Sequence, residues 1–103
     1  MNTTETKIEV KTIDVNAKEW FDKVNGNSYF AANITLNYGM EDEQQITLPF
    51  QYGYGDSYIY AAIKKLNDLE LIPYKEPYDL RESGIITRYT IQKNCKQMEL
   101  KNI

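Results

Sequence analysis

Alternation of apolar and polar residues predicts strands in the first half of the chain. Residues 29–38 and 45–52 both place mostly apolar side chains at even positions. A period of two is typical of a strand with one buried and one wet face. Pro49 lacks an N–H, so we expect its nitrogen to face solvent or a bulge. The even residues expected to face the core are Phe30, Ala32, Ile34, Leu36, Tyr38, Ile46, Leu48, Phe50 and Tyr52.

An earlier strand is predicted over residues 7–15, after a polar stretch at 1–6 that we expect to be frayed. Two alternating apolar pairs in this strand are out of phase: Ile8 with Val10, and Ile13 with Val15. A bulge near residues 11–12 would bring both pairs to one face.

The Asn25-Gly26 pair predicts a hairpin with a type I′ turn, which needs positive φ at both central residues. The alternative is a helix from Asn16, with Glu19 in a capping box and Gly26 as the stop. We favour the hairpin because a strand follows directly from residue 29.

The periodicity changes after residue 55. Asp56 is a suitable N-cap, and residues 56–71 carry one apolar stripe at helical spacing. That stripe consists of Ile59, Ala62, Ile63, Leu66 and Leu69. A loop is predicted at 72–84, which contains two prolines, and a last strand at 85–95 with Tyr89, Ile91 and Cys95 on one face.

The order strand, strand, strand, helix, strand predicts a single α+β domain over residues 1–103. We expect an antiparallel sheet, formed by a three-stranded meander and the C-terminal strand, with one helix packed on its apolar face. The chain is 42% hydrophobic and 26% charged, which is typical of a soluble globular domain.

Charge and composition exclude several functions. The net charge of −3 argues against duplex nucleic acid as a partner, because such binding needs a basic face. Neither an apolar run of membrane length nor a signal-peptide pattern is present, so we expect a cytoplasmic protein without membrane contact.

Candidate catalytic chemistry is sparse. The chain has no histidine, the side chain most often used for proton transfer and metal binding. The single cysteine, Cys95, has no histidine partner, and its place in the strand pattern favours a buried thiol. The acidic residues 41–43 fit no calcium loop and are expected to be solvated. We therefore expect no enzyme activity, no cofactor and no metal.

The glycines at the strand-to-helix junction allow two interpretations. Gly53 and Gly55 can serve a tight turn, or they can expose N–H groups to an anion at the helix N-terminus. Tyr58 stands where a dinucleotide fingerprint has its third glycine, and Asp56 places a negative charge at the helix start. We favour the turn and keep the anion site as the alternative.

Nine tyrosines in 103 residues suggest a binding surface. Two of them on the helix are two positions apart, so their side chains point about 200° from each other and one is expected outside. In the loop, a repeated Pro-Tyr either presents its rings outward or folds them over the helix end. Exposed tyrosines suit protein interfaces and stacking on single-stranded bases. The predicted contact residues are Tyr54, Tyr58, Tyr60, Tyr74 and Tyr78.

Part of the chain, from Trp20 to Leu66, resembles small uncharacterised proteins of tailed phages and prophages. The matching residues are Trp20-Phe21, Gly26-Asn27, Tyr29, Tyr52-Gly53-Tyr54-Gly55-Asp56, Tyr58 and Ala62. The resemblance implies a phage or mobile-element origin, and it implies no activity and no site residue.

We therefore expect a non-enzymatic, phage-encoded accessory protein that binds a host or phage protein in the cytoplasm of an infected bacterium. Inhibition of a bacterial defence system is one form this function takes. The alternatives are a module that binds single-stranded nucleic acid, and a virion or assembly component that forms homo-oligomers through its aromatic residues.

Overall fold

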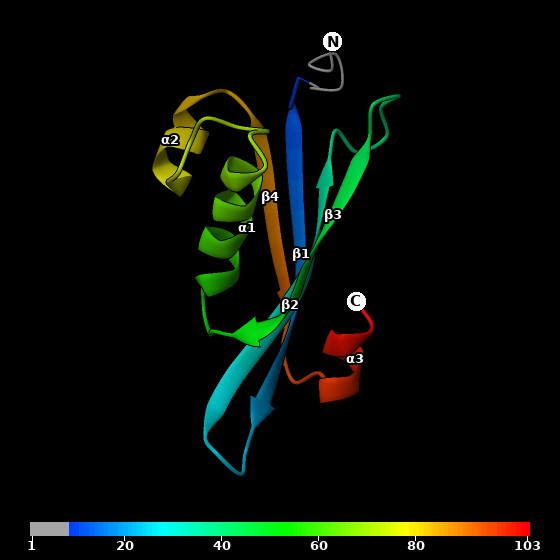
Figure 1. The fold of residues 1–103 in the computed structure, drawn as a ribbon, viewed down its shortest axis with the longest axis vertical. Coiled ribbons are helices and arrows are strands. Elements are labelled where there is room, and N and C mark those ends of the chain that lie inside the picture. Colours follow the sequence, from blue (N-terminus) through cyan, green and yellow to red (C-terminus); the bar gives the residue numbers. More distant parts are fainter. Residues whose placement is uncertain (1–8) are drawn as a thin grey trace.

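A computed structural model describes residues 9–103, which form four strands and three helices. The elements are β1 (Thr12–Asp22), β2 (Asn27–Leu36), β3 (Gln44–Tyr52), α1 (Ser57–Asp68), α2 (Pro77–Glu82), β4 (Ile86–Gln92) and α3 (Gln97–Lys101). The strands make one sheet in the order β3-β2-β1-β4. Figure 1 shows α1 and α2 on one side of the sheet and α3 on the other. The predicted fraying of residues 1–6 and the predicted strand position of Ile8 lie outside the described residues.

The sheet is mixed, which corrects the predicted antiparallel arrangement. Strands β1, β2 and β3 form the expected antiparallel meander. Strand β4, however, pairs in parallel with β1, from Thr12 opposite Ile86 to Lys18 opposite Gln92. Residues 53–85 carry the chain from β3 across one face of the sheet to the far side of β1. Such a helical crossover is the usual connection between strands of the same direction.

The main core lies between the sheet and α1. Fourteen buried residues form it, and full burial of one large apolar side chain contributes about 1.5–3 kcal/mol. Three residues of the predicted helical stripe, Ala62, Ile63 and Leu66, are buried there. Leu69 is exposed because α1 ends at residue 68, and Tyr58 is buried in the first turn.

A second apolar cluster, here called the α3 cluster, lies on the opposite face of the sheet. Ala31, Cys95 and Leu100 are buried in it, and the partly buried residues around them are Trp20, Tyr29, Phe50 and Ile103. The prediction of one helix was therefore wrong: α3 covers this second face, and the predicted loop at 72–84 contains α2. Cys95 is buried, as predicted, but away from Tyr89 and Ile91, because β4 ends at Gln92 and the strand alternation ends with it.

A β-bulge in β3 reverses which face of the sheet its side chains point to. The pairs on either side of the register shift are Ala32 with Leu48 and Phe30 with Gln51. Pro49 lies between them, which confirms the predicted solvent or bulge position for its nitrogen. Beyond the shift, Phe50 and Tyr52 contact Tyr29 in the α3 cluster. Their predicted place in the core under α1 was wrong, and Tyr52 is exposed.

A buried asparagine directly follows strand β2, which ends at Leu36. Asn37 has φ +54, a left-handed conformation that asparagine tolerates better than most residues. Its amide oxygen accepts the N–H groups of Lys11 at 2.7 Å and Thr12 at 3.3 Å, and its amide nitrogen donates to the carbonyl of Glu9 at 3.0 Å. The turn leaves Tyr38 exposed, against the prediction. The bulge predicted near residues 11–12 was meant to explain a change in the alternation of apolar residues. That position lies at the start of β1, where these hydrogen bonds to Asn37 are made.

The hairpin between β1 and β2 confirms the preferred interpretation of the Asn25-Gly26 pair. Its loop nevertheless has four residues, 23–26, and Gly26 has positive φ while Asn25 does not. The type I′ turn was therefore wrong. Asp22 organises the loop, because its carboxylate accepts the N–H groups of Val24 at 3.0 Å and Asn25 at 3.3 Å.

Candidate functional site

The five predicted contact tyrosines are divided between surface and interior. Tyr54, Tyr60 and Tyr78 expose 66%, 55% and 63% of their surface. Tyr74 is half-buried against the main core, so of the two loop tyrosines one folds back and the other points outward. Tyr58 exposes only 5%, which removes it from any contact surface in this conformation.

The interior place of Tyr58 also changes its acidity. The pKa of its hydroxyl is raised above the usual value, mainly because burial removes the group from water. Electrostatic interactions with the nearby Asp56 and Tyr89 raise the pKa further. Tyr58 is thus a core residue, and its raised pKa widens the alkaline range over which its hydroxyl stays neutral in the folded chain.

The two junction glycines have structural roles. A Cβ at Gly53 would lie 2.5 Å from Cε1 of the Phe30 ring, and Gly55 has φ +59. Asp56 occupies the N-cap position of α1 without a side-chain capping bond; Ser57 Oγ instead accepts the N–H of Tyr54 at 3.3 Å. These contacts account for both glycines as parts of a turn, and the anion site stays an untested alternative.

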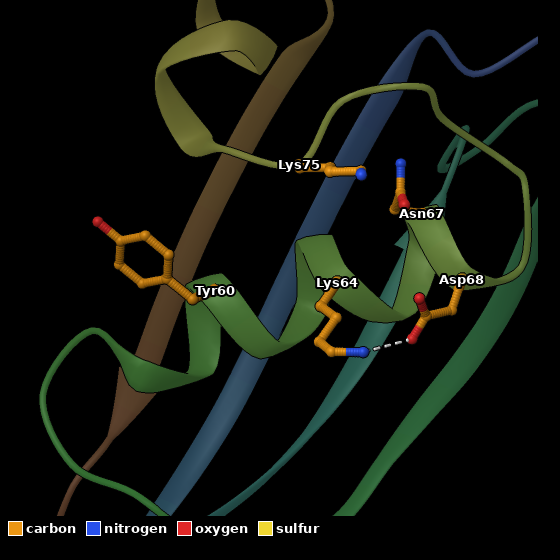
Figure 2. A pocket seen from close by; sticks show the side chains of 5 residues that line it. All are labelled: Tyr60, Lys64, Asn67, Asp68 and Lys75. Atoms are coloured by element: carbon orange, nitrogen blue, oxygen red, sulfur yellow. Dashed lines mark hydrogen bonds and ion pairs between the residues drawn. The ribbon is translucent and has the colours of Figure 1, made fainter.

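A groove of about 420 Å³ runs between α1 and the segment 72–76 (Figure 2). We call it the α1 groove, and its lining residues are Tyr60, Lys64, Asn67, Asp68 and Lys75. Residues 60, 64 and 68 are one helical turn apart, so they form one stripe on the helix face turned away from the sheet. Figure 2 shows the Tyr60 ring extending outward at one end of this stripe.

The outer wall of the groove is held by one asparagine. Asn67 Nδ2 donates to the carbonyl oxygens of Ile72 and Tyr74, both at 3.1 Å. The chain can double back there because Glu70 adopts φ +61 and the Leu71 N–H donates to the Leu66 carbonyl at 2.9 Å. The segment is therefore tied to the helix at defined points.

Charge in the α1 groove is positive in balance. Lys64 Nζ lies 2.8 Å from Asp68 Oδ2, an exposed pair on successive turns. Lys75 is exposed and has no carboxylate within 4.0 Å among residues 9–103. The groove is therefore lined by one unneutralised ammonium group, on Lys75, and by one exposed aromatic ring, on Tyr60. A segment that reaches both could pair a carboxylate with Lys75 and pack on Tyr60.

Sequence reasoning found Tyr60 but missed the other groove residues. The spacing of Tyr60, Lys64 and Asp68 on a predicted helix was a usable signal for one wall. Nothing in the sequence indicated that Asn67 would place Lys75 opposite that wall, because this depends on how the chain leaves the helix.

Sequence reasoning also missed the only ring-to-ring contacts within residues 9–103. These join Trp20, Tyr29, Phe50 and Tyr52 on the α3 side of the sheet, with centroids 5.1–6.2 Å apart. The predicted contact tyrosines have no such contacts, and three of them, Tyr54, Tyr60 and Tyr78, are exposed as single rings. The bulge at Pro49 brings the two β3 aromatics into this cluster.

Within residues 9–103, no three acidic or cysteine side chains are grouped so that they could hold a metal ion. No helix in the same range has the length and apolarity needed to cross a membrane.

Comparison with protein-family models, with curated proteins and with solved structures found no significant match. These comparisons show no family for the chain, and the resemblance to phage proteins remains a prediction from residues 20–66.

Proposed function

We propose that this protein acts by binding another protein through the α1 groove, without catalysis. The observation that supports this proposal is the exposed Tyr60 ring at a groove in which Lys75 has no acidic partner among the described residues. Tyrosine brings a large contact area at a small cost in side-chain entropy. A partner segment with a carboxylate would pair with Lys75 and pack on Tyr60.

The source and purpose of the protein form the second part of the proposal. We take it to be a phage-encoded accessory protein whose partner is a host or phage protein in the bacterial cytoplasm. Inhibition of a bacterial defence system is one form of this role. The support for it is the sequence pattern between Trp20 and Leu66, which contains the exposed Tyr54.

Affinity capture from bacterial lysate tests the proposal. The immobilised protein is compared with the double variant Tyr60→Ser/Lys75→Glu and with Lys23→Glu, an exposed charge reversal in the hairpin loop. We expect a discrete protein to be retained by the wild type and Lys23→Glu and lost from the double variant. Equal capture by all three, or none above background, would contradict the proposal. A salt-dependent shift with single-stranded oligonucleotides would favour the nucleic-acid alternative.

A further inference from the structure

Strand β4 leaves one edge of the sheet open. Its inner side pairs with β1, and the Ile86 N–H donates to the carbonyl of Lys11 at 3.1 Å. Main-chain groups of successive residues in a strand point to opposite sides. The N–H and C=O groups of Thr87, Tyr89 and Ile91 therefore point outward, and β4 pairs with no strand but β1 among residues 9–103.

The two edges of the sheet differ in protection. The β3 edge contains Pro49 and a bulge, both of which hinder pairing with another strand. Strand β4 has seven residues without proline, glycine, lysine or a register shift. Four of its seven residues are β-branched, namely Ile86, Thr87, Thr90 and Ile91, which favours extended pairing.

From this edge we infer that β4 pairs in antiparallel fashion with β4 of a second copy, centred on Tyr89. In that register Tyr89 lies opposite Tyr89 of the second copy, and Thr87 opposite Ile91. These are hydrogen-bonded pairs, so every outward N–H and C=O of the three residues finds a partner. The contact is isologous and produces one continuous eight-stranded sheet with both α1 helices on the same face.

The side chains on the α3 side of the sheet agree with a second copy as the occupant. Arg88 lies opposite Thr90, and Ile86 opposite Gln92, so no like charges face each other. Arg88 donates hydrogen bonds to the carboxylate of Asp14 in its own chain, which neutralises its charge. The strand is therefore complementary to itself, whereas an unrelated peptide would need a matching sequence.

Proline at position 87 tests the contact with little change to the fold. The Thr87 N–H points away from β1, so Thr87→Pro removes an outward donor and leaves the inner ladder intact. The matched control is Thr87→Val, which keeps the N–H and the branched side chain. Sedimentation equilibrium from about 1 µM to about 1 mM covers the affinity expected of a small interface.

We expect the wild type and Thr87→Val to reach twice the chain mass as concentration rises, and Thr87→Pro to remain monomeric with an unchanged circular dichroism spectrum. A wild type that stays monomeric throughout, or a folded Thr87→Pro that still dimerises, would overturn the inference.

Cysteine pairs test the register even if the proline variant fails to fold. In a Cys95→Ala background, an equimolar mixture of Arg88→Cys and Thr90→Cys should form a disulfide-linked dimer under mild oxidation. Residues 88 and 90 would be a directly opposed, non-hydrogen-bonded pair, whose Cα atoms are about 4.5 Å apart. Failure of the mixture to cross-link above the level of either single variant would contradict the register. A separate peptide or protein found on this edge would also overturn the second copy as its occupant.

Discussion

The buried amide of Asn37 is expected to contribute strongly to stability, and its replacement tests how β1 begins. The side chain is 1% exposed and makes three hydrogen bonds to the main chain of residues 9–12. Each such bond contributes about 0.5–1.5 kcal/mol net. Loss of all three in Asn37→Gly should therefore lower the free energy of unfolding by about 2–4 kcal/mol.

Alanine at the same position separates the hydrogen bonds from the backbone conformation. Asn37 has φ +54, which glycine adopts freely and alanine does not. Asn37→Ala should thus be about 1 kcal/mol less stable than Asn37→Gly. The matched control is Asn33→Ala in β2. The amide of Asn33 accepts only the exposed Thr47 hydroxyl at 3.3 Å, so this substitution should change stability by less than about 0.5 kcal/mol.

Urea denaturation followed by the fluorescence of Trp20, the single tryptophan, measures all three variants. A loss below about 0.5 kcal/mol in Asn37→Gly would refute the reasoning, because the three bonds would then not hold the start of β1. Equal stability of the glycine and alanine variants would refute the backbone part alone.

Three further predictions concern the core. Gly53→Ala should lower the free energy of unfolding by about 1–3 kcal/mol, because the new Cβ would contact the Phe30 ring. Phe30→Leu should relieve part of this loss in a double-mutant cycle measured by urea denaturation. Strictly additive effects of the two substitutions would contradict the close contact. Burial raises the pKa of Tyr58, so the unfolded chain ionises first as pH rises past about 10 and the free energy of unfolding falls. Tyr58→Phe should make this decrease in the free energy of unfolding smaller in melts at alkaline pH. An unchanged dependence of stability on pH would contradict the raised pKa of Tyr58. Leu100→Ala should lower the free energy of unfolding by about 2–5 kcal/mol. It should also shift the fluorescence emission of Trp20 to longer wavelength, because both residues belong to the α3 cluster. Unchanged emission would show that α3 does not cover the tryptophan.

Local patterns in the sequence predicted the elements that depend on near neighbours. The meander of three strands and the apolar stripe of α1 follow from periods of two and 3.6 residues, and the hairpin at Gly26 follows from the Asn-Gly pair. The helix at 97–101 has only five residues, too few for a helical repeat to be recognised, so its packing on the second face of the sheet was not predictable in this way.

Tertiary pairing decided the features that the sequence did not predict. The direction of β4 depends on which edge of the sheet the chain reaches after residues 53–85, and no local signal specifies that edge. The bulge beside Pro49 shifts Phe50 and Tyr52 to the other face, although their alternation continues unbroken in the sequence.

The candidate site shows the same division. Helical geometry predicted that one of Tyr58 and Tyr60 would be exposed, because the two cannot both face the sheet, and the structure shows that the exposed one is Tyr60. The opposing wall of the α1 groove depends on two bonds from Asn67 to the returning chain. Lys75 therefore enters the site through a contact between the helix and the following segment, which sequence spacing does not reveal.

Photo-cross-linking in bacterial cells tests the proposed binding through the α1 groove most directly. A photoreactive phenylalanine analogue replaces Tyr60 in one protein and Tyr52, exposed on the other side of the sheet, in the control. The proposal predicts a discrete cross-linked protein from position 60 that disappears when Lys75→Glu is added, and none from position 52. A cross-link from position 52 alone, or from neither position, would contradict it.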